Sequence, residues 1–219
     1  MSKSILVTGS TGYVCNHFVK KILETTDLFI IVSYRVEKGH YEKNNRLIFE
    51  KGELSDPTSF CSIFEKYKPE FVVHLAAMAR VKDGEINPVE VLKANYIGTL
   101  SLINMAIKYG VKTIITTSSN LIEQDCQRLD SESTNIINFR MPNVIDSNGS
   151  VTLIFKRQIE NNQPITITHP EMSRMFISGE HAADLLLYLL IKGEHRGVYV
   201  SYDPPIKITE LAKKMIAKS

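Results

Sequence analysis

The chain of 219 residues is long enough for one large domain, or for one domain with a smaller second part. Its formal net charge of +2 is too small to indicate nucleic acid or a membrane surface as a partner. No apolar run approaches the roughly 20 residues of a membrane-spanning helix, and the first residues lack a signal-peptide pattern. The three cysteines lack metal-ligand spacing, so we expect no metal, reduced thiols and a cytoplasmic location.

The first apolar run leads into the turn Thr8-Gly-Ser-Thr-Gly12, after which apolar residues recur at helical spacing. In this order of strand, turn and helix, the free N–H groups of the helix point at a ligand over the turn, where a pyrophosphate fits. Gly9 allows the sharp turn, and Gly12 allows close approach of a phosphate. Cys15 stands where the pattern usually has a third glycine. The alternative is an ordinary turn that binds nothing.

Further strand-like runs follow, and segments with helical spacing lie between most of them. This alternation predicts an α/β fold with a Rossmann-like, doubly wound parallel sheet. Such a sheet binds its ligand beyond the carboxyl ends of its strands. The expected strands are residues 5–7, 29–33, 46–50, 71–75 and 111–117, and two expected helices are residues 56–67 and 88–109.

Polar and small residues follow these strands at the edge where the ligand is expected. Gly9, Arg35, Ala76 and Ser118 all occupy such positions. Arg35 favours NADP over NAD, because an arginine there accommodates the 2′-phosphate, and a solvated loop charge is the alternative. Asn95 lies among the apolar positions of the helix expected at 88–109, so it is either a structural clamp or a site residue.

The second half of the chain is less regular. A sixth strand at 136–140 is followed by a polar loop at 141–149. We therefore expect residues 1–140 to form a dinucleotide-binding domain, and residues 141–219 to form a small mixed α/β part interleaved with it. The remaining expected helices are residues 151–160, 180–191 and 208–218, and the remaining expected strands are residues 164–168 and 198–202.

Several motifs occur together along nearly the whole chain. They are Thr8-Gly-Ser-Thr-Gly12, Gly52-Glu53, His74-Leu-Ala-Ala77, Asn95-Tyr-Ile-Gly-Thr-Leu100, Gly110-Val-Lys112, Asn143-Val144, Gly149-Ser-Val151 and Ile165-Thr-Ile-Thr-His-Pro-Glu-Met-Ser-Arg-Met-Phe176. With these motifs the chain resembles the extended short-chain dehydrogenase/reductases. The resemblance is to their nucleotide-sugar 4,6-dehydratase/epimerase branch, which serves polysaccharide biosynthesis.

The resemblance implies a cofactor, NADP or NAD, and a nucleotide-sugar ligand of the UDP-sugar type. In relatives an arginine and a Gly-Ser-Val segment hold the UDP-sugar pyrophosphate, and guanidinium matches phosphate oxygens. The implied cofactor-binding residues are Gly9, Thr11, Gly12, Tyr13, Val14, Arg35, Glu53, Leu54, Ala76, Ala77, Asn95 and Ser118. The implied substrate-binding residues are Asn143, Gly149, Ser150, Val151 and Arg174.

The catalytic groups of the resembled family have no counterparts here. Relatives carry Ser/Thr-Asp-Lys after the fifth strand and then a helix with a Tyr-x-x-x-Lys-type pair, but this chain reads Ser119-Asn120-Leu121. The 15 residues from Leu121 to Asn135 contain no Tyr and no Lys, so we expect the catalytic helix to be deleted or cut to a stub at 125–129. Ser118 and Ser119 are the remaining catalytic candidates, and His74 is expected in the core.

Three hypotheses remain open. The chain is a family member that binds NAD(P) and a nucleotide sugar with lost or reduced catalysis. Alternatively, it is an active dehydratase, epimerase or reductase with a non-standard acid and base. In the third hypothesis it is a non-catalytic scaffold or the regulatory partner of an intact paralogue. The catalytic helix usually builds the dimer interface of relatives, so their oligomeric state does not transfer.

Overall fold

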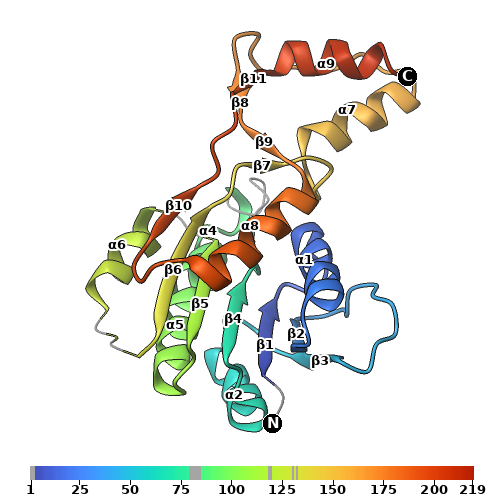
Figure 1. Ribbon diagram of the computed structural model, residues 1–219. Coiled ribbons are helices and arrows are strands. Elements are labelled where there is room, and N and C mark those ends of the chain that lie inside the picture. The colour runs from blue at the N-terminus through green and yellow to red at the C-terminus, as the bar shows by residue number, and fades with distance from the viewer. Residues whose placement is uncertain (1–2, 79–84, 118–119, 130, 132) are drawn as a thin grey trace.

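The computed structural model describes residues 3–78, 85–117, 120–129, 131 and 133–219. Within these residues seven strands form one sheet in the order β10-β6-β5-β4-β1-β2-β3, and every neighbouring pair is parallel (Figure 1). The predicted doubly wound parallel sheet is therefore confirmed. The strands are β1 Ser4–Thr8, β2 Phe29–Tyr34, β3 Leu47–Lys51, β4 Phe71–His74, β5 Thr113–Thr117, β6 Asn135–Arg140 and β10 Val198–Val200.

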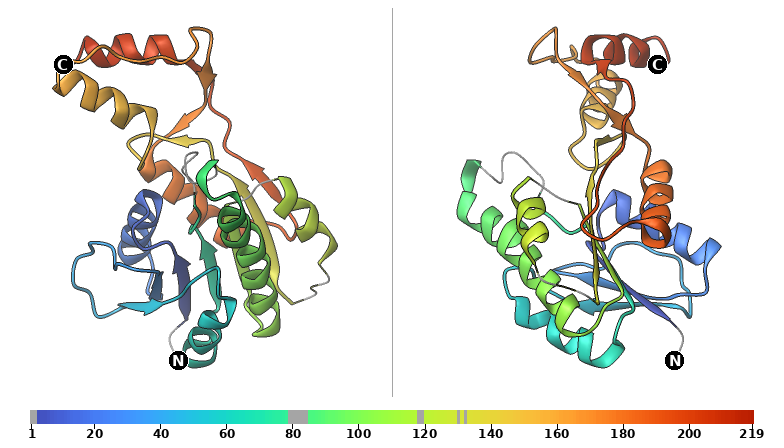
Figure 2. Two further views of the ribbon diagram at one scale, coloured as in Figure 1. Left: turned by 180° about the vertical axis from the view of Figure 1, so that it is seen from behind. Right: turned by 60° about the vertical axis from the view of Figure 1, so that its left-hand side comes forward.

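Side chains of the central strand alternate between two cores, one on each face of the sheet. Ile5 and Val7 pack in the core beneath α1 (Tyr13–Thr25) and α8 (Gly179–Lys192). Leu6 packs in the core on the other face, to which every remaining helix of this part except α4 contributes side chains. The remaining helices are η1 Pro57–Phe60, α2 Cys61–Tyr67, α4 Pro88–Leu92, η2 Lys93–Gly98, α5 Thr99–Lys108 and α6 Asn120–Arg128, and Figure 2 shows the two layers from the side.

The helix expected at 56–67 begins as its sequence predicts. The side chain of Asp56 accepts a hydrogen bond from the Thr58 amide at 3.2 Å, and Pro57 occupies the first turn. The first turn is a 3₁₀ turn, and the α-helix follows at Cys61. Local capping chemistry therefore sets the start of this segment.

The long helix expected at 88–109 is not uniform. Its middle segment η2 is a π-helix between α4 and α5. The Thr99 hydroxyl donates to the Asn95 carbonyl oxygen at 2.8 Å at the end of this segment. Short π segments frequently mark functional sites, and this one carries Asn95.

Two stretches beyond β6, residues 143–177 and 206–216, build a small lobe over the carboxyl end of the sheet (Figure 1). Its helices α7 (Val151–Glu160) and α9 (Ile208–Ile216) pack around Phe155 and Phe176. The lobe also contains two pairs of very short strands. In one pair β7 (Asn143–Val144) lies parallel to β9 (Phe176–Ile177), and in the other β8 (Ser173–Arg174) lies antiparallel to β11 (Ile206–Lys207). The expected polar loop at 141–149 therefore includes β7.

The strand expected at 164–168 is wrong, because the structure has no regular element there. Ile165 and Ile167 do pack against the lobe core, which accounts for the alternating pattern. The side chain of Gln158 accepts from the Thr166 amide at 3.3 Å and donates to its hydroxyl at 2.9 Å. The Thr166 amide is thus hydrogen-bonded to the side chain of a helix residue rather than to the backbone of a partner strand.

The lobe and the sheet are interleaved along the chain. After β9 the chain returns to the sheet as α8 and β10, and it then re-enters the lobe as β11 and α9. The division at residue 140 stays a prediction. No helix in the described part of the chain has the length and apolar character needed to cross a membrane.

Candidate functional site

A cavity of about 330 Å³ lies at the carboxyl ends of β1, β2 and β4. The glycine-bearing turn forms one wall, and the segment after β4 forms another. Eight of the expected cofactor-binding residues line it, namely Gly9, Thr11, Gly12, Arg35, Glu53, Leu54, Ala76 and Ala77. The residues that the sequence predicts at the carboxyl ends of these strands therefore line one cavity.

Two glycines of the turn occupy positions with little room for a side chain. Gly9 has φ +94°, and a Cβ there would lie 3.0 Å from the Ala76 amide nitrogen. A Cβ on Gly12 would lie 3.0 Å from the Gly9 carbonyl oxygen. Gly12 is also the N-cap of α1, so the free N–H groups of that helix begin here. The turn is a cradle that a side chain would fill.

The loop after β2 is fastened onto this turn. The Tyr41 hydroxyl donates to the Ser10 carbonyl oxygen at 2.7 Å and contacts the Cys15 thiol at 3.4 Å. The Ser10 hydroxyl donates to the Glu37 carbonyl oxygen at 3.1 Å. Burial raises the pKa of Cys15 to about 12, so this thiol stays protonated. Cys15 is thus a packing residue beneath the cradle.

The far wall of the cavity carries both signs of charge. The Arg35 Nε lies 3.9 Å from a carboxylate oxygen of Glu53. Glu37 also lines the cavity, so one guanidinium stands among two carboxylates. Because the Arg35 side chain is 60% exposed, the attraction between the two groups is weak, but it directs Arg35 toward Glu53.

A chain of buried hydrogen bonds supports the cavity floor. The Thr8 hydroxyl oxygen accepts from the Leu75 and Ala76 amides, each at 3.1 Å, and lies 2.7 Å from the His74 Nδ1. The His74 Nε2 lies 2.9 Å from the Thr99 hydroxyl. Since Thr8 already accepts two amides, its proton points to Nδ1, and Nε2 carries the ring proton. His74 is therefore a satisfied, neutral core histidine, 2% exposed.

Stability should fall as pH falls through the titration range of His74. Burial lowers the pKa of His74 from 6.5 to about 4, so between these values the unfolded chain binds a proton that the folded chain does not. The folded state therefore loses about 3 kcal/mol between pH 6.5 and pH 4. Urea unfolding at pH 7 and pH 4.5 measures this loss. His74→Gln should flatten the pH dependence, and an unchanged slope would contradict the assignment.

Asn95 holds the segment after β4 from the side. Its Oδ1 accepts from the Met78 amide at 2.7 Å, and its Nδ2 donates to the Met78 carbonyl oxygen at 2.9 Å. Met78 lines the cavity, whereas Asn95 does not. Asn95 therefore acts here as a clamp that positions a cavity wall. Tyr13 and Val14 also lie outside the lining, where they pack against the hydrophobic cluster at the base of the lobe.

The segment that follows β5 is a nine-residue helix, α6, longer than the expected stub at 125–129. It is fixed to its neighbours by polar contacts. Arg140 donates to the Glu123 carboxylate through two nitrogens, with Nε at 2.7 Å. The Tyr96 hydroxyl donates to the Asp125 carboxylate, and Gln127 donates to the Arg196 carbonyl oxygen at 2.8 Å. The helix α6 is therefore packed into the fold as an integral part of it.

The expected substrate-binding residues lie in the lobe, away from the cavity lining. Asn143 donates to the Met175 carbonyl oxygen at 3.2 Å, and Ser150 caps α7 by accepting from the Leu153 amide at 3.4 Å. Gly149 has φ +82°, and Val151 begins α7. Arg174 is exposed on β8, and its guanidinium donates to the Ser173 carbonyl oxygen at 2.8 Å.

Some site residues fall outside what the structure describes or what the sequence predicts. Ser118 and Ser119, the catalytic candidates, lie outside the described residues. Of the other lining residues, Gly52 belongs to the motif Gly52-Glu53, and Ser33 and Tyr34 lie at the end of the strand expected at 29–33. No local signal marks Phe60 or Ala94. In the described part of the chain, no group of three or more His, Cys, Asp or Glu side chains is arranged to hold a metal ion.

Comparison with known protein families gives a match along the chain. A family model described as "Polysaccharide biosynthesis protein" matches residues 5–219. The probable polysaccharide biosynthesis protein EpsC of Bacillus subtilis is 30% identical over 240 residues, which cover 98% of this chain and 40% of EpsC. The capsular polysaccharide biosynthesis protein CapD of Staphylococcus aureus is 29% identical over 245 residues, which cover all of this chain and 41% of CapD. The chain thus spans about two fifths of the length of these relatives.

Solved structures share the fold. Pen from Bacillus thuringiensis superposes with a TM-score of 0.87 at 27% identity, covering 99% of this chain and 74% of Pen. The UDP-glucose 4-epimerase of Thermotoga maritima, solved with UDP-glucose, gives 0.86 at 23% identity, with coverages of 98% and 82%. The Thermus thermophilus UDP-glucose 4-epimerase, solved with NAD, gives 0.82 at 19% identity, with the same coverages. Because the family model spans almost the whole chain, the protein belongs to the polysaccharide biosynthesis protein family.

Proposed function

We propose that this chain binds a nicotinamide dinucleotide in the cavity and a nucleotide sugar beside it, with lost or reduced catalysis. The observation that carries the proposal is the glycine cradle at the start of α1, where a Cβ on Gly12 would lie 3.0 Å from the Gly9 carbonyl oxygen. A helix N-terminus with a side-chain-free approach suits a pyrophosphate. When bound, the dinucleotide supplies hydride transfer.

The residues around the cradle fit the rest of a dinucleotide. Gly9, Thr11 and Gly12 would hold the pyrophosphate, while Arg35 and Glu53 would flank the adenosine end. The solved Thermus thermophilus relative was crystallised with NAD, which agrees with this use of the fold. Asn95 would act through Met78, whose backbone it holds in the wall.

We propose NAD as the cofactor rather than the NADP that Arg35 alone indicates. The guanidinium of Arg35 lies 3.9 Å from Glu53, and Glu37 stands in the same lining. A 2′-phosphate brings further negative charge to a wall that already has two carboxylates and one cation. The adenosine end of the cavity therefore favours a free 2′-hydroxyl.

The nucleotide sugar would lie between the sheet and the lobe. Arg174 remains the proposed phosphate clamp, because its guanidinium is exposed and bonds only its neighbour's carbonyl among the described residues. Asn143 and the Gly149-Ser-Val151 turn are the proposed remaining contacts. The Thermotoga maritima relative was solved with UDP-glucose, which supports a UDP-sugar as the ligand class.

Loss or reduction of catalysis is proposed from the segment between β5 and β6. Residues 121–135 contain no Tyr and no Lys, and the helix α6 is held by Glu123, Asp125 and Gln127. We also propose that a paralogue or a second copy of the chain completes the site. The proposed location of the protein is the cytoplasm.

Proton NMR tests the proposal on one sample that contains the protein, UDP-N-acetylglucosamine and NAD, followed over hours. We expect saturation transfer from protein to both ligands and no new sugar signals. New 4-keto-6-deoxy or epimer signals would establish an active enzyme with a non-standard acid and base. Absence of transfer to either ligand would leave the scaffold hypothesis. Calorimetric titration with NAD and NADP then measures the cofactor preference.

A further inference from the structure

The strand β10 forms an open edge of the sheet. It pairs with β6 on one side only, and it has no strand partner on the other side among the described residues (Figure 1). The side chains of Val198, Val200 and Tyr202 are exposed by 38%, 51% and 82%, while Ser201 between the last two is buried. Exposed strand edges with apolar side chains readily pair with another strand.

We propose that this edge pairs with the same edge of a second copy of the chain, in antiparallel orientation, with the two-fold axis at Val200. The proposal does not depend on the proposed function. The Gly197 carbonyl accepts from the Asn138 amide, so by alternation Val198 and Val200 direct their own N–H and C=O groups outward. Two outward-facing Val200 residues can then exchange both backbone hydrogen bonds across the axis.

This register matches the exposed side chains with one another. Val200 faces its own copy, and Val198 faces Tyr202 of the second copy on both sides of the axis. Every exposed apolar side chain of the edge therefore meets an apolar side chain, as a self-complementary two-fold contact requires. A shift by one residue would instead place the buried Ser201 opposite this apolar row.

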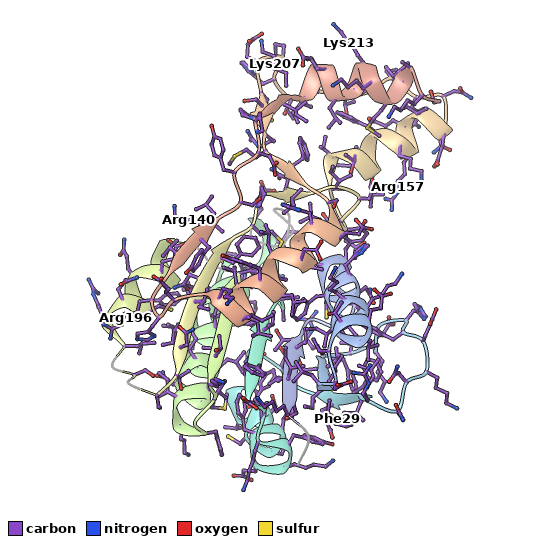
Figure 3. The ribbon with its side chains drawn as sticks, in the orientation of Figure 1. Phe29, Arg140, Arg157, Arg196, Lys207 and Lys213 are labelled. Atoms are coloured by element: carbon purple, nitrogen blue, oxygen red, sulfur yellow. The ribbon has the colours of Figure 1, made fainter. Side chains whose placement is uncertain are left out.

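Charges at the ends of the edge agree with the same register. Arg196 lies at the end where β10 begins, as Figure 3 shows, and Asp203 follows the other end. Neither side chain forms an ion pair with another residue that the structure describes, although the Arg196 guanidinium donates one hydrogen bond to the Leu129 carbonyl oxygen at 2.7 Å. Antiparallel pairing brings Asp203 of each copy to the end that holds Arg196 of the other. Opposite charges thus flank the apolar centre.

The edge also limits how far such pairing extends. Pro204 and Pro205 follow directly, and proline cannot donate a backbone hydrogen bond to a partner strand. A two-fold contact uses the same surface on both copies, so it closes after two chains. The structure therefore fits a dimer with one continuous sheet through both subunits, rather than a growing fibre.

Light scattering coupled to gel filtration tests this on the whole chain. We expect the wild type to have twice the mass of one chain, and Val200→Lys to dissociate more readily by about tenfold or more, because two ammonium groups would meet at the axis. Ile216→Lys is the matched control, since Ile216 is 54% exposed on α9 and distant from the edge in Figure 1. It should remain a dimer.

A second variant guards against misfolding of the first. Tyr202→Lys changes a side chain that is 82% exposed and should weaken the dimer while the far-ultraviolet circular dichroism stays unchanged. A monomeric wild type would overturn the proposal. A dimer that tolerates both Val200→Lys and Tyr202→Lys would also overturn it, because the contact would then lie elsewhere.

Discussion

Gly12→Val is expected to weaken dinucleotide binding by about 100-fold or more while the chain still folds. The Cβ would lie 3.0 Å from the Gly9 carbonyl oxygen, and the isopropyl group would fill the approach to the first N–H groups of α1. Charge-assisted hydrogen bonds contribute about 1.5–3 kcal/mol each, so the loss of two weakens binding by about 100-fold or more. Calorimetric titration of NAD into wild type and variant gives the ratio.

The control for this variant is a substitution at a glycine that does not line the cavity. Gly110 has φ +68°, and a Cβ added there would meet nothing within 4 Å, so Gly110→Ala strains only the backbone. That strain costs about 1–2 kcal/mol. Gly110→Ala should bind NAD as the wild type does. Unchanged affinity in Gly12→Val would mean that the cavity is not the dinucleotide site.

Thr8→Val is expected to lower the free energy of unfolding by about 2–5 kcal/mol, the largest stability effect that we predict for a single methyl-for-hydroxyl exchange. The Thr8 hydroxyl serves His74 and the Leu75 and Ala76 amides, and all three groups would lose their partner. Valine has almost the same shape, so the cost comes from the unsatisfied polar groups rather than from a void. Chemical denaturation at pH 7 measures it.

The strand β5, which is the neighbour of β4 on the side away from β1, provides a matched exchange of threonine for valine. The Thr117 hydroxyl donates a single bond, to the His74 carbonyl oxygen at 3.2 Å, so Thr117→Val should cost only about 1 kcal/mol. Ala76 lines the cavity, and Thr8→Val should therefore weaken NAD binding as well. If the two substitutions lowered the free energy of unfolding equally, the three hydrogen bonds of Thr8 would contribute no more to stability than the single bond of Thr117.

The sheet could be predicted because its strands are local apolar runs and its crossover rules are strict. The expected runs at 29–33 and 71–75 appear as β2 and β4 within one residue at their ends. The exception, 164–168, has an apolar alternation identical to that of a strand. Its backbone is bonded by Gln158, a side chain eight residues earlier, and no periodicity reveals such a contact.

The candidate site could be predicted in part for a similar reason. Residues at strand ends, such as Gly9 and Arg35, are marked by their position after an apolar run. Phe60 and Ala94 reach the cavity from helices on one face of the sheet, and only the packing of those helices places them there. The sequence leaves Asn95 open between clamp and site residue, since one sequence cannot identify Met78 as its partner.

The interleaving of lobe and sheet has a consequence for the order of folding. The two helices of the lobe, α7 and α9, flank α8 and β10 in the sequence, so the lobe core around Phe155 joins segments that are far apart in the chain. Contacts between distant segments form late, because closing the chain between them costs entropy before the contact stabilises it. We therefore expect the lobe core to close after α8 and β10 have docked on the sheet, and to open before the sheet does.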